Sequence, residues 1–171
     1  MTQRGAATET VNLDRHCYGP VDAPITVVEY GDFECPYCGA AAPVLRRLVD
    51  AADDRVRLIF RHFPLFQKHP FALTAALAAE AAGDRFWSMH DLLFAHQDRL
   101  TDADLARYAA ELGVDGAVGE PAQALRPAVE ADYAAGGADG VRGTPTLFVD
   151  GRLYTGRAEL AALRSALGLR R

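Results

Sequence analysis

Two cysteines that are separated by two residues follow an apolar, β-branched run of the chain. The run at 25–30 has the composition of a buried strand, and apolar side chains recur at helical spacing after the second cysteine. Cys35 is therefore predicted at the N-cap of a helix, with Pro36 at the first helical position, where its missing N–H costs nothing, and Cys38 in the first turn. This pair at a strand-to-helix junction restricts the fold more than any other feature.

The cysteine pair has two obvious chemical uses, a metal site and a redox dithiol. Zinc needs four ligands, and no second Cys-x-x-Cys pair exists, so Cys17, His62 and His69 could complete a site only by coincidence of folding. A dithiol needs only two sulfurs that can bridge, one of them nucleophilic. Because the free N–H groups and dipole of a helix start lower a cysteine pKa, Cys35 is predicted to attack and Cys38 to resolve. This chemistry needs no metal and no organic cofactor.

The two ends of the chain predict β structure. The strand at 25–30, the helix that starts at Cys35 and an alternating segment at 56–60 form a βαβ unit, which implies a parallel strand pair. Segments at 146–149 and 152–154 predict an antiparallel hairpin, because the Asp-Gly pair between them is a favoured two-residue turn. A closing helix with an apolar stripe follows at about 160–167.

The middle of the chain predicts helices. Residues 70–137 show no strand pattern and are rich in Ala, Leu and Glu. Pro70 suits the first turn of one helix that ends near Gly83. Asp84 is a candidate N-cap for the next helix.

Two more helices are predicted in the second half of this block. The segment 101–104 resembles a capping box, and Gly113 suits the end of the helix that follows it. A fourth helix is expected at about 121–135, with a kink at Pro127, because proline cannot donate the backbone hydrogen bond that a helix interior needs.

Composition and charge exclude several classes of protein. The chain has 171 residues, of which 50% are hydrophobic, so one domain at 14–171 after a polar segment at 1–13 is expected, with a helical insertion at about 70–138. A net charge of −5 with scattered basic residues disfavours a nucleic-acid or anionic-membrane partner. No apolar run is long enough to span a bilayer or to form a signal peptide, which predicts a cytoplasmic protein without membrane insertion.

Four blocks of sequence, in this order, carry a resemblance to a known family. They are Glu29-Tyr30-Gly31-Asp32-Phe33-Glu34-Cys35-Pro36-Tyr37-Cys38, Arg61-His62-Phe63-Pro64, Phe86-Trp87-Ser88-Met89-His90 and Gly143-Thr144-Pro145-Thr146. Together they are similar to bacterial DsbA-like thiol:disulfide oxidoreductases of the thioredoxin superfamily, over about residues 14 to 168. The resemblance implies an α/β thioredoxin fold with a helical insertion.

The resemblance also implies roles for single residues. Cys35 matches the nucleophile of the family and Cys38 its resolving thiol. Thr144 and Pro145 match a loop whose proline is cis and lies beside the disulfide, where the Thr144 backbone pairs with an extended substrate. Glu29 matches a buried acid that moves the proton of the inner cysteine.

One departure from the family suggests the direction of the reaction. Pro36 matches the family, but oxidants of this family usually have His where Tyr37 stands, and Tyr37 cannot stabilise a thiolate by charge. A less oxidising couple is expected, which favours reductase or isomerase work. Disulfide-containing proteins or peptides are the expected substrates, and glutathione or a thioredoxin system the expected thiol partner that recycles the enzyme.

Several alternatives stay open at this point. A glutathione-linked isomerase or transferase on the same scaffold generally lacks the second cysteine, so Cys38 argues against it. A non-catalytic peptide-binding or chaperone module would fit better if either cysteine were missing. Glu29 could be an ordinary solvent-exposed acid at a strand end. Cys17 is interpreted as a small core residue that forms no bridge to Cys35, and a regulatory thiol is the competing interpretation.

Overall fold

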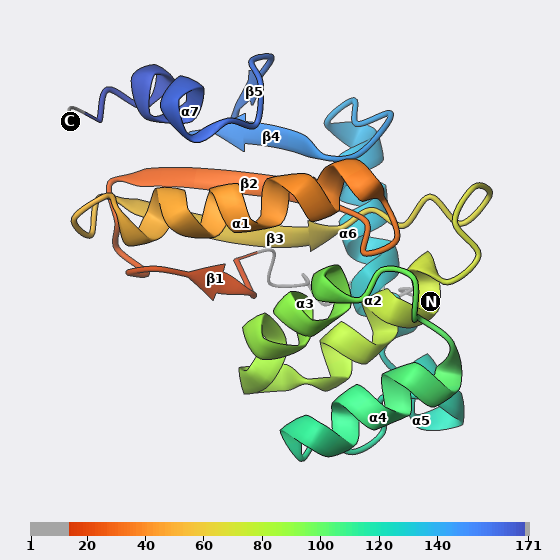
Figure 1. Cartoon of the computed structure of the whole chain (residues 1–171). Helices are drawn as coiled ribbons and strands as arrows, with labels where there is room; N and C mark the ends of the chain where they lie inside the picture. Colours follow the sequence, from red (N-terminus) through yellow and green to blue (C-terminus); the bar gives the residue numbers. More distant parts are fainter. Residues whose placement is uncertain (1–13, 170–171) are drawn as a thin grey trace, which may run out of the picture.

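A mixed sheet of five strands forms the centre of the molecule, in the order β1-β3-β2-β4-β5 (Figure 1). The computed structural model describes residues 14–169, so the polar segment predicted at 1–13 lies outside the described residues. The strands are β1 (Cys17–Tyr18), β2 (Ile25–Gly31), β3 (Val56–His62), β4 (Thr146–Val149) and β5 (Arg152–Tyr154). This order places the two strands of the predicted βαβ unit next to each other, inside the sheet.

The strand pairing follows from the pattern of the sequence. β2 and β3 are parallel and pair along their whole length. β4 is antiparallel to β2, with Thr146 opposite Tyr30, and β5 returns beside β4. Asp150 and Gly151 both have positive φ angles, 46° and 77°, which a tight two-residue hairpin turn requires. The predicted parallel pair and the predicted hairpin are both confirmed.

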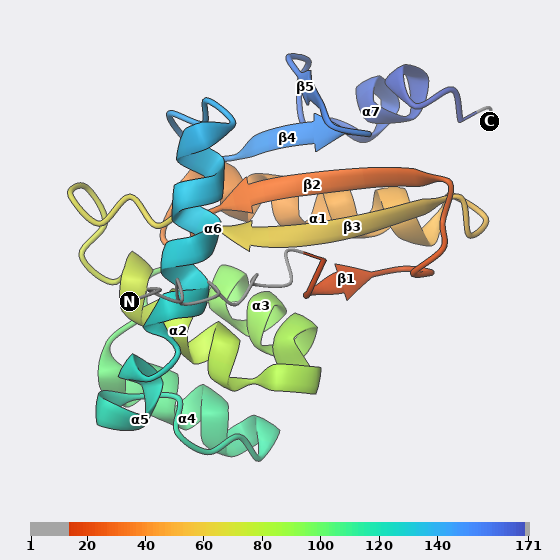
Figure 2. The same ribbon diagram turned by 180° about the vertical axis from the view of Figure 1, so that it is seen from behind.

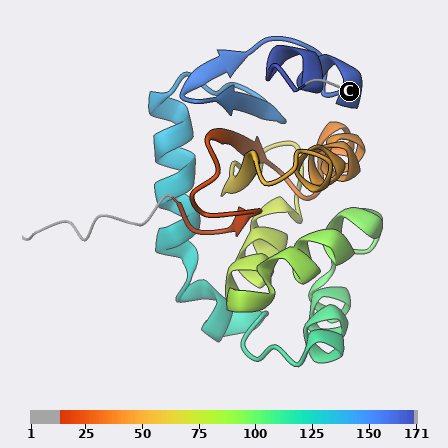
Figure 3. The same ribbon diagram turned by 90° about the vertical axis from the view of Figure 1, so that its left-hand side faces the viewer.

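Helices cover both faces of the sheet. Helix α1 (Pro36–Asp50) connects β2 to β3 and packs with α7 (Leu160–Ala166) on one face. Helix α6 (Arg126–Ala138) crosses the other face and contacts β3 (Figures 2 and 3). The amino-terminal end of α1 thus lies at the edge of the sheet where β2 and β3 end.

The helical block lies between β3 and β4 in the sequence, and all of it except α6 lies below the sheet in Figure 1. Besides α6 it contains α2 (Ala72–Ala81), a 3₁₀ turn at Gly83–Arg85, α3 (Phe86–Ala95), α4 (Asp102–Leu112) and α5 (Gly119–Gln123). Phe33 and Phe60 from the sheet side belong to the same apolar cluster as Met89 and Leu93 of α3. The insertion and the sheet therefore share a core. The fold is the expected thioredoxin fold with a helical insertion.

Two details of the insertion differ from the sequence prediction. Asp84 does not cap a helix: it lies inside the 3₁₀ turn, and α3 begins after Arg85 without a side-chain cap. The fourth helix of the prediction, expected at about 121–135 with a kink, is instead two separate helices, α5 and α6. Pro127 occupies the first turn of α6 instead, where its missing N–H leaves no hydrogen bond unmade and its ring meets no preceding turn.

The other helix ends are close to the prediction. The α2 helix begins at Ala72 after an N-cap at Phe71, so Pro70 lies just before its first turn rather than in it. Thr101 and Asp104 form the predicted capping box, and Gly113 ends α4 in the left-handed conformation. Within residues 14–169, no helix is long and apolar enough to cross a membrane.

Candidate active site

Cys35 lies where the sequence predicts it, at the N-cap of α1 and directly beyond the end of β2. Its backbone is extended, and Pro36 occupies the start of the helix. A hydrogen bond from the Cys38 thiol has the largest effect on the Cys35 pKa, and the Thr144 side chain and the N–H groups of Cys38 and Tyr37 act in the same direction. Together they lower this pKa to about 5, against the opposing effect of burial. Cys35 is therefore a thiolate at neutral pH.

Cys38 has the opposite electrostatic environment. Its side chain is fully buried one turn into α1. Burial raises the pKa of Cys38 far above that of a free thiol, and the proximity of Cys35 and Glu29 raises it further. The reduced pair thus holds one thiolate and one thiol, and the thiol proton points at the thiolate.

Glu29 lies on β2 and is completely buried, which excludes the alternative of a solvent-exposed acid at a strand end. Neither carboxyl oxygen has a hydrogen-bond partner among the described residues. Burial, and to a smaller extent the negative charge of Cys35, raises the pKa of Glu29 to about 8. A carboxyl with this pKa is able to gain or lose a proton near neutral pH.

The loop before β4 completes the site. The pairing of β4 with β2 places Thr144 and Pro145 beside the start of α1, and the Thr144–Pro145 peptide bond is cis. The Thr144 carbonyl oxygen lies 3.4 Å from the Cys35 sulfur. Tyr37, which lies between the two cysteines in the sequence, is 74% exposed, so its ring is accessible to a partner. The predicted site residues therefore gather at one end of the sheet.

Two carboxylates just before Cys35, which the sequence patterns did not identify, bind the loop after β3 by hydrogen bonds. Asp32 is buried, and its carboxylate accepts hydrogen bonds from the N–H of Leu65 at 2.9 Å and from Nδ1 of His69 at 2.7 Å. Glu34 accepts a hydrogen bond from the N–H of Phe71 at 2.8 Å. Both acids lie within the three residues before Cys35, but the segment that they bind lies more than 30 residues further on.

Gln97 is a second missed residue, and it comes from the insertion. Its Nε2 donates hydrogen bonds to the carbonyl oxygens of Phe33 and Cys35, both at 2.8 Å. A Cβ atom at Gly39 would collide with the Gln97 side chain, so glycine at this position leaves room for Gln97. The glycine after Cys38 was the only sign of this contact in the sequence.

Two histidines, His16 and His62, form a cluster with Glu80 elsewhere, which we call the Glu80 cluster. Nε2 of His16, Nε2 of His62 and a carboxylate oxygen of Glu80 lie within 4.8 Å of one another, a spacing that could suit a metal ion. However, the same Glu80 oxygen also accepts two hydrogen bonds from Arg15. Nδ1 of His62 is buried without a partner, whereas metal-binding histidines usually donate from their second nitrogen. The donors present favour a buried ion-pair network.

That network extends to α6. Arg15 also binds the carboxylate of Asp132 with two hydrogen bonds, at 2.9 and 2.7 Å, and Asp132 is fully buried. Asp132 accepts a further hydrogen bond from the backbone N–H of His62. Although burial opposes ionisation, the hydrogen bonds from His16 and His62 hold the pKa of Glu80 well below its usual value. The Glu80 cluster thus joins the start of the described chain to the insertion.

Comparison with known proteins agrees with this geometry. A thioredoxin family model matches residues 11–168, and the chain belongs to this family. A thioredoxin-like oxidoreductase from Silicibacter pomeroyi DSS-3 superimposes with a TM-score of 0.78 at 28% identity, covering 95% of this chain and 96% of that one. DsbA2 from Pseudomonas aeruginosa gives a TM-score of 0.66 at 28% identity, covering 96% of this chain and 95% of that chain. The chain is therefore a DsbA-like member of the thioredoxin superfamily.

The curated relatives that match the chain are longer proteins named as Na(+)/H(+) antiporters. The chain is 50% identical over 163 residues to a Na(+)/H(+) antiporter NhaA 1 of Salinispora arenicola, and 40% identical over 159 residues to one of Mycolicibacterium gilvum. These matches cover 92% and 89% of this chain but 25% and 26% of those proteins. The chain thus spans about a quarter of the curated relatives that it matches.

Proposed function

We propose that the protein exchanges disulfides with protein or small-molecule substrates through Cys35 and Cys38, in the reductase or isomerase direction. The observation that carries the proposal is the division of the pair into a thiolate and a thiol. The Cys35 pKa is lowered to about 5, whereas burial strongly raises the pKa of Cys38. Only Cys35 is then able to start the reaction at neutral pH.

The first step is attack of the Cys35 thiolate on a substrate disulfide. The substrate S–S bond breaks, a mixed disulfide with Cys35 forms, and the first substrate thiolate leaves and takes a proton from water. The Thr144 backbone, beside the sulfur, supports the pairing of an extended substrate strand with this loop. Pro36 and Tyr37, which follow the reacting sulfur in the sequence, are both exposed and accessible to the substrate.

Glu29 prepares the second step. Its raised pKa depends partly on the Cys35 charge, and that charge disappears when the mixed disulfide forms. The Glu29 pKa therefore falls when the mixed disulfide forms, and the carboxyl releases its proton to solvent. The ionised carboxylate then accepts the proton of Cys38. The Cys38 thiolate attacks the Cys35 sulfur, the Cys35–Cys38 disulfide forms, and the second substrate thiolate leaves. Two electrons have then moved from the enzyme to the substrate.

The direction of the reaction and the recycling partner rest on the composition of the site. Tyr37 carries no charge that would further favour the reduced enzyme. Glutathione or a thioredoxin system then reduces the Cys35–Cys38 disulfide. The cytoplasmic location stays a prediction, and the redox state of the pair in intact cells tests it.

Reduction potential and trapping test this function. The potential of the pair against a glutathione buffer is expected below that of strongly oxidising relatives. Cys35→Ser should abolish disulfide reductase activity, and Cys38→Ser should accumulate mixed disulfides. Cys17→Ala, which removes a thiol outside the site, is the matched control. Full activity of Cys35→Ser would refute the mechanism.

The same variants separate the alternatives. If Cys38→Ser kept full turnover with glutathione alone, a glutathione-linked isomerase or transferase would be the better interpretation. If both cysteine variants retained peptide binding and the wild type showed no turnover, the chain would be a binding or chaperone module. The hydrogen bond between Cys38 and Cys35 favours neither alternative.

A further inference from the structure

A pocket of about 200 Å³ lies between the loop after β3, helix α6 and the loop that leads to the cis proline. Its lining consists of Leu65, Phe66, Gln67, Lys68, Tyr133 and Arg142. Figure 1 shows both loops at the end of the sheet where α1 begins. We call this cavity the Lys68/Arg142 pocket.

Two cations and no acid line this pocket. Lys68 and Arg142 are both exposed, and neither forms an ion pair with another residue of the range 14–169. Arg142 donates one hydrogen bond, from Nη1 to the carbonyl oxygen of Val141, which leaves its other N–H groups for a ligand. Two uncompensated cations in one pocket attract a carboxylate.

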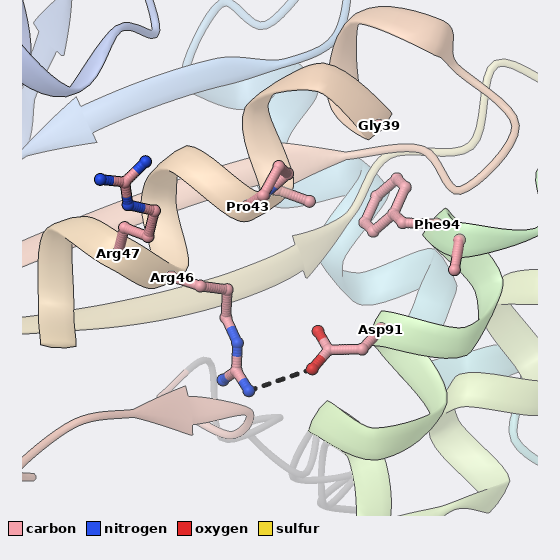
Figure 4. Close-up of a pocket in the computed structure, with 8 residues that line it drawn as sticks. Gly39, Pro43, Arg46, Arg47, Asp91 and Phe94 are labelled. Carbon is pink, nitrogen blue, oxygen red and sulfur yellow. Dashed lines mark hydrogen bonds and ion pairs between the residues drawn. The ribbon is translucent and has the colours of Figure 1, made fainter.

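Two other cavities differ from this pocket because each contains an acid. A larger cavity of about 460 Å³ lies between α1 and α3, and there Asp91 forms an ion pair with Arg46 at 3.1 Å (Figure 4). In a third cavity, of about 270 Å³, Glu130 lies 4.0 Å from Arg126. Arg47 also lines the larger cavity, but each of these two cavities contains an acid that would repel a carboxylate ligand.

The Lys68/Arg142 pocket is close to the reacting sulfur. Arg142 precedes Thr144 by two residues, a separation that spans at most about 7 Å, and the Thr144 carbonyl lies 3.4 Å from the Cys35 sulfur. On the other wall, Leu65 donates its N–H to Asp32, three residues before Cys35. A residue close in sequence to the reacting cysteine of a bound partner would therefore reach the pocket.

We propose that the Lys68/Arg142 pocket binds a carboxylate that the disulfide partner carries one or two residues from its reacting cysteine. The inference rests on the proposed exchange reaction and specifies its partner. A volume of about 200 Å³ holds one side chain, whereas whole small-molecule sites measure about 300–1,000 Å³. The carboxylate comes from an acidic residue of a peptide or from an end of glutathione, and both sources present the same group.

Matched pairs of disulfides test the proposal. One pair consists of mixed disulfides of a short peptide with Glu or Gln two residues from its cysteine. The other consists of glutathione disulfide and its ethyl ester. The wild type should reduce the acidic member of a pair with a kcat/KM about tenfold higher, which corresponds to about 1.4 kcal/mol. Lys68→Gln/Arg142→Gln should remove this preference and leave the rate with the neutral member unchanged.

Arg152→Gln is the control, because it removes one positive charge from the exposed hairpin strand β5. It should keep the preference. The single variants Lys68→Gln and Arg142→Gln should each lose part of it, which guards against a folding defect in the double variant. Preference in either pair supports the pocket and identifies the source of the carboxylate. The proposal is wrong if neither pair shows a preference, or if the double variant slows both members equally. In that case Cys35→Ser still tests the exchange reaction independently.

Discussion

Glu29 should make the stability of the protein depend on pH in an unusual direction. Burial raises its pKa from 4.5 to about 8, and a difference of that size corresponds to about 5 kcal/mol between the protonated and ionised forms. Between these two pH values the folded protein holds a proton that the unfolded chain releases. The free energy of unfolding therefore falls as pH rises through this window, whereas an ordinary paired carboxylate gives the opposite trend.

The test uses Cys35→Ser as the background, because the Cys35 thiolate titrates in the same range and raises the Glu29 pKa. Urea unfolding is compared between Cys35→Ser and Cys35→Ser/Glu29→Gln. The first should lose about 3 kcal/mol relative to the second between about pH 5 and pH 7. Glutamine carries no charge, so any cost of burying its amide is the same at each pH and does not change the slope.

Parallel pH profiles of the two variants would refute this reasoning. They would mean that Glu29 is ionised in the folded protein, or that water reaches it. The proton-transfer role would then lose its physical basis, although attack by Cys35 would not. An enzyme assay complements the measurement: Glu29→Gln should leave the first attack nearly intact and slow the resolving step near neutral pH.

Three further predictions concern other parts of the chain. Alkylation of reduced Cys35 should rise with pH around a midpoint of about 5 and precede that of Cys38, and a midpoint near that of a free thiol would contradict the N-cap mechanism. Thr101→Ala should cost about 1 kcal/mol of stability in thermal unfolding, because it removes the capping box of α4; no loss would show that the cap is dispensable. Cys17→Ala should leave the reduction potential unchanged, and a Cys17 disulfide detected by mass spectrometry under non-reducing conditions would contradict this.

The prediction for Cys17 has a geometric reason. Cys17 lies half-buried on β1 opposite Ile59, at the far edge of the sheet from β4. Two strand spacings, about 10 Å, separate β1 from β2, and Cys35 lies beyond the end of β2. A disulfide needs Cα atoms within about 7 Å, so no bridge to Cys35 forms in this fold. Cys17 is only partly buried, whereas the sequence predicts a core residue at this position.

Local patterns predicted those features that depend on neighbouring residues. The position of Cys35 follows from a strand, a proline and helical spacing within about 20 residues, and the hairpin follows from one dipeptide. The sequence predicts a kink at Pro127 instead of the break before α6, because proline suits both a kinked helix and a first turn. Only packing of the insertion selects between them. Gln97 and His69 could not be found in this way. Each forms hydrogen bonds with backbone or carboxylate groups that are distant in the sequence and become neighbours only in the folded protein.

The Glu80 cluster has a consequence for the order in which the protein folds during synthesis. Arg15 and Asp132 are separated by 117 residues, yet Asp132 is buried and Arg15 binds it with two hydrogen bonds. A ribosome that has made the first strands and α1 must still extend the chain through most of the insertion before this charge is matched. The part of the chain that contains the first strands and α1 therefore becomes fully stable only after α6 has been synthesised. Fragments that end before Asp132 should consequently be sensitive to proteolysis even where they include the complete dithiol.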